Sequence, residues 1–178
     1  AWFSFFDIGF THGLRNKFAE AKAKGDDEVV KIYISTTYYY ISLIFIALWV
    51  VLIFVNQFIS WHKILNLPPA MESEVSRLAI LVVTYFCFQF IFKVIGTILI
   101  ADQQSAKSSL LDMLGQLLSL IIIFILTKLT NGTLMNLGLA VGFSQIIVLL
   151  AANVILFKTK YKDYRPSLKF VKKEYAAN

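Results

Sequence analysis

The stretch YYYISLIFIALWVVLIFV, Tyr38 to Val55, decides the fold class of this chain. It contains no charged residue, and at the helical rise of about 1.5 Å per residue it nearly spans a hydrocarbon core of about 30 Å. With its flanks, the segment from about Tyr33 to Phe58 is long enough to cross a bilayer as a helix. A membrane strand is excluded because the apolar residues do not alternate with polar ones.

Three further stretches of similar length and composition follow, at about Leu78–Ala101, Ser108–Leu129 and Thr133–Phe157. The chain as a whole is 58% hydrophobic and 16% charged, whereas soluble domains carry about a quarter charged residues. We therefore predict an all-α, polytopic transmembrane bundle, with four helices in residues 33–157. The lipid bilayer is its first expected partner.

The basic residues are distributed unevenly around these spans. One side of the predicted bundle receives most of them: Arg15, Lys17, Lys22, Lys24, Lys31, Lys107, Lys158, Lys160, Lys162, Arg165, Lys169, Lys172 and Lys173. The other side receives only Lys63, Arg77 and Lys128. The positive-inside rule places the basic segments in the cytoplasm. The same distribution accounts for the net charge of +6 without a nucleic-acid partner.

The segment before the first span, residues 11–32, has the pattern of a basic amphipathic helix. Its apolar residues recur at helical spacing on one side: Leu14, Phe18 and Ala21. Gly25 suits a left-handed helix stop, and Asp26 or Asp27 can cap the helix that follows. We expect the short helix to lie against the cytoplasmic face of the membrane.

The two ends of the sequence have the character of connections to a larger protein. Residues 1–10 resemble the end of a truncated transmembrane helix, and residues 158–178 read as a basic cytoplasmic linker. We therefore expect the chain to be a fragment.

The stretch FQFIFKVIGTILIAD, Phe88 to Asp102, places Lys93 among apolar residues. A charge at the middle of a membrane helix costs about 2.5–3.5 kcal/mol on insertion scales, so such residues face water or a partner. Its helix carries a polar stripe at four-residue spacing: Tyr85, Gln89, Lys93 and Thr97. The next helix carries another: Ser105, Ser108, Asp112, Gln116 and Ser119. Antiparallel packing across a short turn would bring Lys93 and Asp112 to comparable depth.

Three interpretations of this lysine remain open. It could form a structural ion pair with Asp112, or extend its ammonium group to the membrane interface. It could instead line a cavity and meet a lipid pyrophosphate, since lysine binds phosphate as a compact point charge. In the third interpretation Asp112 is protonated or ion-bound during a coupled transport cycle.

Elsewhere the sequence favours packing over chemistry. Gly138 and Gly142 form a GxxxG pair whose face continues to Gln145, which is typical of close helix contact. The single cysteine, Cys87, reads as a small packing residue. His12 and His62 fall on opposite sides of the membrane, and we find no catalytic triad, metal-ligand cluster or phosphate-binding glycine loop. We expect no enzyme, no cofactor and no metal.

Several stretches carry a family resemblance. They are WFSFFDIGFTHGLRNKFAEAKAKGD with the following KIYISTTYYY, and later FKVIGTILIADQQSA and LGQLLSLIIIFILTK. These resemble O-antigen flippases, the Wzx-like polysaccharide-biosynthesis proteins of the multidrug/oligosaccharidyl-lipid/polysaccharide exporter superfamily, which includes the MATE transporters. The run from Gly13 to Lys17 is the most specific element. One departure is Phe10-Thr11-His12, where relatives commonly have Leu-Gly-Asn.

The resemblance implies two bundles of six helices around a central cavity, of which this chain would cover the end of helix two through helix six. The implied function is the flipping of polyprenyl-pyrophosphate-linked oligosaccharide units, precursors of O-antigen or exopolysaccharide, across the bacterial inner membrane by alternating access. The implied partners are this lipid-linked substrate and the second bundle of the same protein. Glycosyltransferases and a polymerase are candidate partners.

The candidate substrate residues are Arg15, Lys17, Lys93 and Gln89, and the candidate coupling or counter-ion residues are Asp7 and Asp112. Arg15, Lys17 and Asp7 depend on the family motif, whereas Lys93 and Asp112 depend on the cost of burying charge. Two alternatives remain: a MATE-type antiporter for drugs or other organic cations, and a non-transporting membrane scaffold for glycan assembly.

Overall fold

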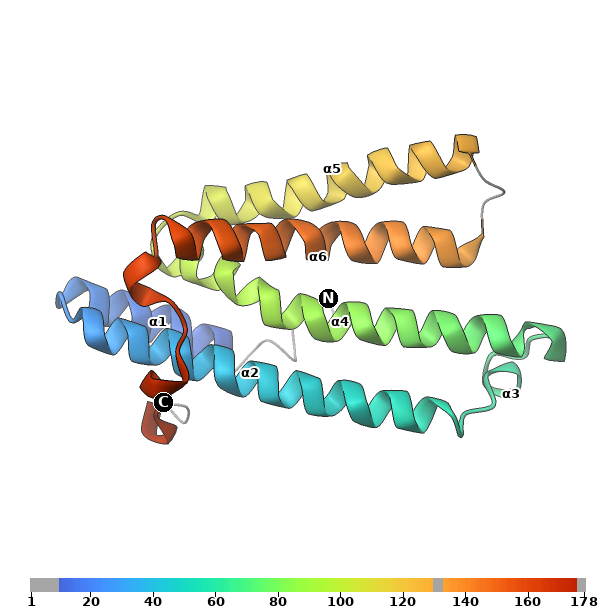
Figure 1. Cartoon of the computed structure of the whole chain (residues 1–178), viewed down its shortest axis with the longest axis horizontal. Helices are drawn as coiled ribbons and strands as arrows, with labels where there is room; N and C mark the ends of the chain where they lie inside the picture. Colours follow the sequence, from blue (N-terminus) through green and yellow to red (C-terminus); the bar gives the residue numbers. More distant parts are fainter. Residues whose placement is uncertain (1–9, 130–132, 176–178) are drawn as a thin grey trace.

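The long helices of this protein form an antiparallel bundle. The computed structural model describes residues 10–129 and 133–175, and its regular secondary structure in these ranges is entirely helical. Four long helices run up and down in turn: α2 (Asp27–Asn56), α4 (Glu72–Ala101), α5 (Ser105–Leu129) and α6 (Leu134–Lys158) (Figure 1). All four are long and apolar enough to cross a membrane. The predicted all-α bundle is confirmed, and these helices make it a membrane protein.

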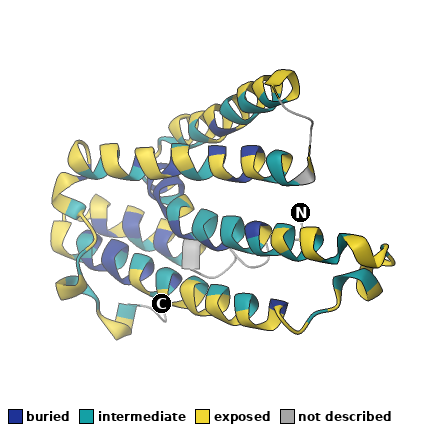
Figure 2. Ribbon diagram, turned by 45° about the vertical axis from the view of Figure 1, so that its right-hand side comes forward, coloured by how far each residue is buried: buried dark blue, intermediate teal, exposed yellow. Residues whose placement is uncertain are grey.

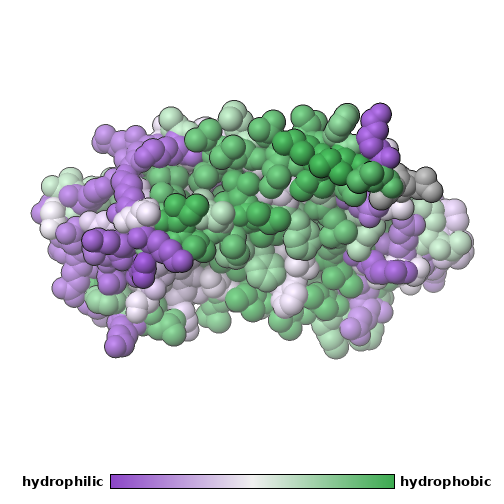
Figure 3. Space-filling view, turned by 45° about the horizontal axis from the view of Figure 1, so that its top comes forward, coloured by the Kyte–Doolittle hydropathy of each residue, from purple (hydrophilic) through white to green (hydrophobic). Residues whose placement is uncertain are grey.

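Three of the long helices begin several residues earlier than the apolar stretches indicated. α2 starts at Asp27 rather than near Tyr33, and α4 starts at Glu72 rather than near Leu78. Apolar composition marks only the part of a helix that lies in hydrocarbon, and polar residues continue the helix beyond it. The 30 residues of α2 measure about 45 Å, more than the core of about 30 Å. Figure 3 shows the result, an apolar band between two hydrophilic ends.

The first helix, α1 (Phe10–Ala23), packs by one side against α2 and α4. Leu14, Phe18 and Ala21 are buried in the same cluster as residues of α2 and α4. The helix expected on the membrane surface therefore turns its apolar side toward protein. The α1–α2 turn is as expected: Gly25 adopts φ +70°, and the Asp26 carboxylate accepts a 3.1 Å hydrogen bond from the backbone N–H of Val29.

The buried core lies at one end of the bundle, where α1 packs on its neighbours (Figure 2). We call this the basic end; it holds α1, the α4–α5 turn and residues 159–175. Toward the other end, apolar side chains stay uncovered, and Phe124 and Leu129 of α5 are 65% and 76% exposed. Lipid tails cover such faces in a bilayer.

The connection between α2 and α4 contains the short helix α3 (Trp61–Leu65) and a 3₁₀ turn, η2 (Pro69–Met71). Glu72, the first residue of α4, accepts hydrogen bonds from the backbone N–H groups of Trp61 at 2.9 Å and His62 at 2.8 Å. Its carboxylate also contacts the His62 ring. Glu72 therefore caps α3 and ties this connection to α4.

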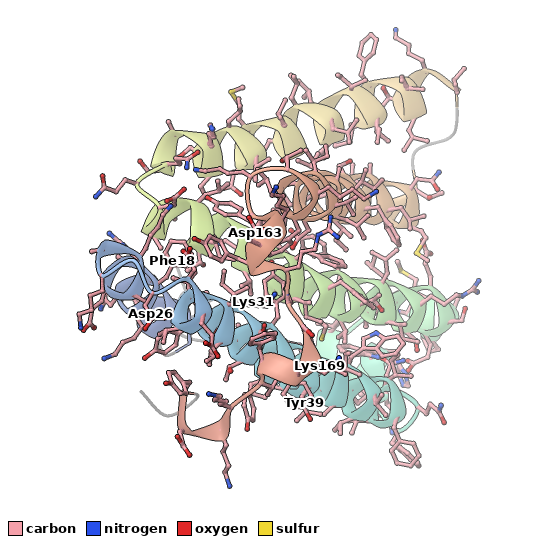
Figure 4. All side chains as sticks on the ribbon, turned by 60° about the vertical axis from the view of Figure 1, so that its left-hand side comes forward. Phe18, Asp26, Lys31, Tyr39, Asp163 and Lys169 are labelled. Atoms are coloured by element: carbon pink, nitrogen blue, oxygen red, sulfur yellow. The ribbon has the colours of Figure 1, made fainter. Side chains whose placement is uncertain are left out.

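After α6 the chain crosses α2 instead of leaving the bundle. Three 3₁₀ turns follow one another in this segment: η3 (Lys162–Tyr164), η4 (Leu168–Phe170) and η5 (Lys173–Tyr175). The backbone N–H of Ser167 donates to the Ser35 hydroxyl at 3.1 Å. In Figure 4 the segment, marked by Asp163 and Lys169, passes over the half of α2 that carries Lys31. The expected linker is thus packed against the first spanning helix.

Candidate functional site

Two cavities lie between α4, α5 and α6, one of mixed lining and one mainly polar. The lysine cavity, of about 240 Å³, is lined by Lys93, Thr97, Ser108 and Asp112 together with apolar neighbours. The glutamine cavity, of about 280 Å³, is lined mainly by polar residues: Tyr85, Gln89, Asp112, Gln116, Ser119 and Gln145. Asp112 borders both cavities. Residues of the two polar stripes therefore line neighbouring cavities that share Asp112, and we call the two cavities together the groove.

The α4–α5 pairing sets the depth of the two charged groups. Lys93 lies eight residues before the end of α4, or about 12 Å along its axis, and Asp112 lies seven residues, or about 10 Å, after the start of α5. The helices approach closely here: a Cβ on Gly96 would stand 3.0 Å from the Ser108 hydroxyl oxygen. Lys93 and Asp112 thus reach comparable depth, as predicted.

Lys93 and Asp112 nevertheless do not form an ion pair. Within the described ranges, no ion pair or hydrogen bond joins the two side chains, and the Lys93 side chain is exposed toward the lysine cavity. The Asp112 carboxylate instead accepts a hydrogen bond from the Gln145 side-chain nitrogen of α6 at 3.2 Å. The structural ion pair considered from the sequence is therefore not formed in this structure.

Gln145 reaches Asp112 because residue 115 has no side chain. A Cβ on Gly115 would stand 1.8 Å from the Gln145 amide oxygen and 2.6 Å from its side-chain carbonyl carbon. The Gln145 amide therefore occupies the space that any other residue at position 115 would fill. Sequence reasoning grouped Gln145 with the packing face of α6 and missed this contact.

The glycine pair on that face does have the packing role predicted for it. A Cβ on Gly138 would stand 3.1 Å from a Leu78 methyl group, and one on Gly142 would stand 3.2 Å from the Tyr85 ring. Both glycines thus hold α6 close to α4. Gln145 lies beyond them along α6 and turns toward α5 instead.

The structure separates Arg15 and Lys17 from this groove. Arg15 is exposed on α1, and Lys17 forms a 3.6 Å ion pair with Glu20 on the same helix. Neither of these basic residues lines the two cavities. Asp7 lies outside the described residues. Lys93, Gln89 and Asp112 are therefore the candidates that the tertiary structure brings together.

A second charged site, at Asp102 in the α4–α5 turn, was missed. Its side chain is 7% exposed and contacts the amines of Lys22 and Lys160, while the Tyr161 hydroxyl donates to it at 2.9 Å. Burial alone would raise the pKa of this carboxyl, but the hydrogen bonds from Lys160, Lys22 and Tyr161 outweigh it and lower the pKa to about 2. No spacing signal could reveal the site, because Lys22 and Lys160 lie 80 and 58 residues away.

Uncharged polar bonds also join the spanning helices. The Tyr38 hydroxyl donates to the Asn153 amide oxygen at 2.6 Å, and the Asn153 amide nitrogen donates to the backbone carbonyl of Phe92 at 2.9 Å. Asn153 thus connects α2, α4 and α6. Trp49 of α2 likewise donates its indole N–H to the Thr84 hydroxyl of α4 at 2.9 Å.

Comparison with known proteins finds no relative of this chain. The chain matches no protein-family model, no curated protein and no solved structure at a significant level. In the described part of the chain, His, Cys, Asp and Glu form no group of three or more that could hold a metal ion.

Proposed function

We propose that this chain is part of a transporter that flips polyprenyl-pyrophosphate-linked oligosaccharide units across a bacterial inner membrane, with its basic end in the cytoplasm. One observation carries the proposal: Lys93 is exposed, has no ion-pair partner among the described residues, and borders the lysine cavity about 12 Å from the end of a helix long enough to span a membrane. An ammonium group facing lipid there would cost several kcal/mol. A hydrated cavity that receives an anionic head group accounts for its presence.

The groove also suits the other parts of this substrate. The Lys93 ammonium would contact a pyrophosphate oxygen, and the amide and hydroxyl groups of Gln89, Gln116 and Ser119 can hydrogen-bond to sugar hydroxyls. The polyprenyl tail would stay in lipid while alternating access moves the head group. This division matches a molecule that is polar at one end and apolar along the rest.

The remaining candidates act around the groove in this proposal. Arg15 and Lys17 lie on α1 at the basic end, where positive charge raises the local concentration of anionic head groups. Asp112 serves as counter-ion or coupling group beside Lys93, and Asp7 has the same assignment through the family motif alone. The second bundle of the protein would close the groove from the other side.

A complementation experiment tests the proposal. The full-length protein should restore surface glycan in a flippase-deficient strain, and Lys93→Ala should abolish the restoration at normal abundance in the membrane. Lys128→Ala is the matched control, because Lys128 lies in the last turn of α5, at the end of the bundle opposite the basic end. Full glycan with Lys93→Ala would reject the role of this lysine, and absence of restoration by the unmodified protein would reject flippase function.

The organic-cation antiporter is a second candidate because the Asp112 carboxylate borders both cavities. Lys93 weighs against it, since a cationic ligand in the lysine cavity would meet a like charge. Resistance to cationic drugs, conferred by the full-length protein and lost with Asp112→Asn, would favour the antiporter. The scaffold alternative gains no support from any contact described above.

A further inference from the structure

We propose that Gln145, seated against Gly115, holds the Asp112 carboxylate away from Lys93 and thereby keeps Lys93 free for a phosphate-type anion. The inference rests on the proposed function for the identity of that anion. It assigns to Gln145 and Gly115 a positioning role that neither residue type suggests by itself.

The missing ion pair requires a cause. Lys93 and Asp112 border the same cavity of about 240 Å³ at comparable depth, yet they do not pair. Opposite charges that border one cavity attract each other, and the attraction is screened where water enters. The observed competitor for the carboxylate is the Gln145 amide, whose nitrogen donates to it at 3.2 Å. That hydrogen bond draws the Asp112 carboxylate toward α6.

Gln145 can compete with Lys93 for the Asp112 carboxylate because Gly115 has no side chain. The Gln145 amide oxygen lies 1.8 Å from the position that a Cβ on Gly115 would occupy, so even alanine there would expel the amide. Gly142, one turn earlier on α6, allows the Tyr85 ring to approach to 3.2 Å of its Cβ position and keeps α6 beside α4. Gln145 is thus held at the height of Asp112 by packing on two helices.

The lysine cavity offers three hydrogen-bond donors to an anion, among apolar residues and beside the Asp112 carboxylate that Gln145 binds. The ammonium group of Lys93 and the hydroxyls of Thr97 and Ser108 line it, and all three can donate hydrogen bonds to phosphate oxygens. A paired Asp112 would neutralise the lysine and block it. An Asp112 bound to Gln145 leaves the positive charge available.

Acylation of Lys93 measures its freedom without any substrate. In the full-length protein in nanodiscs, we expect a water-soluble acetylating reagent to modify Lys93, as quantified by mass spectrometry. Gly115→Ala and Gln145→Leu should each slow this modification about tenfold, because Asp112 then pairs with Lys93. The double variant Gly115→Ala/Asp112→Asn should return to within about twofold of the unmodified rate. Gly138→Ala, which alters the packing of α6 away from the groove, is the control and should leave the rate of Lys93 acylation unchanged.

Binding of farnesyl pyrophosphate to the same proteins tests the ligand class. The affinity should fall about tenfold in Gly115→Ala and recover in the double variant with Asp112→Asn. If Gly115→Ala leaves the Lys93 acylation rate unchanged, or if the double variant stays as slow as the single one, the positioning role is overturned. If acylation behaves as expected but the unmodified protein does not bind farnesyl pyrophosphate, the ligand assignment and the proposed function are overturned while the hold on Asp112 is supported.

Discussion

Tyr161, the third residue after α6, donates its hydroxyl to the Asp102 carboxylate of the α4–α5 turn across 2.9 Å. Both side chains are nearly enclosed: Tyr161 is 1% exposed and the Asp102 side chain 7%. Burial of Tyr161, and then its hydrogen bond to Asp102, raise the pKa of the phenol far above its ordinary value. Together with the contacts that Lys22 of α1 and Lys160, just after α6, make with Asp102, this bond joins three segments at the basic end of the bundle.

We expect Asp102→Asn to destabilise the protein by about 1–3 kcal/mol in free energy of unfolding, the usual effect of losing charged hydrogen bonds. The lower part of this range is favoured because Lys22 and Lys160 keep more than a third of their side chains exposed to solvent, which screens the interaction. Thermal unfolding in detergent, followed by tryptophan fluorescence, measures the effect. Asp163→Asn, on the exposed segment after α6, is the control; an equal loss there would contradict the assignment.

The same site predicts a dependence of stability on pH. The pKa of Asp102 is lowered from 3.8 to about 2, so its contribution is complete above about pH 4 and is lost as the pH falls toward 2. The difference in unfolding midpoint between the unmodified protein and Asp102→Asn should therefore shrink between about pH 4 and pH 2. A difference that stays constant over this interval would show that charge at position 102 does not carry the stabilisation.

Asn153→Leu should destabilise the bundle because it removes hydrogen bonds to two other helices, at the Tyr38 hydroxyl and the Phe92 carbonyl. Each interhelical polar bond in a membrane contributes about 0.6 kcal/mol on average and up to about 1.7. We expect about 1–2 kcal/mol in detergent-induced unfolding. Thr84→Val, which removes one interhelical bond, from Trp49, and the hydroxyl's bond to the Ile80 carbonyl within α4, should cost less; the reverse order would refute the connecting role of Asn153.

If water fills the lysine cavity, as proposed, two exposed positions should differ in chemical accessibility. In a Cys87→Ser background, Lys93→Cys should react with a membrane-impermeant maleimide, because residue 93 borders the lysine cavity. Ile125→Cys should not react, although Ile125 is 47% exposed, since it lies in the apolar part of α5 that lipid covers. Reaction at 125 but not at 93, measured in native membranes, would mean that Lys93 does not meet water.

Local signals in the sequence predicted a large part of this structure. Unbroken apolar stretches located the four spanning helices, and Gly25 with Asp26 predicted the α1–α2 turn. The short α4–α5 turn made the depth of Lys93 and Asp112 predictable, because consecutive antiparallel helices keep their register. Each of these inferences needs only neighbouring residues and the regular rise of a helix.

Other features depend on how the helices rotate and pack, and only the tertiary structure decided them. The apolar side of α1 was visible, but lipid and protein are equally good apolar partners, so its burial against α2 and α4 was not predictable. The Asp102 contacts join residues far apart in the chain, and a rotation of α6 by a fraction of a turn would place Gln145 against α4 instead of Gly115. The sequence by itself thus determined which segments cross the membrane and how deep their charges lie. Whether Lys93 meets Asp112 or stays free was decided by side-chain packing between three helices, which no local pattern encodes.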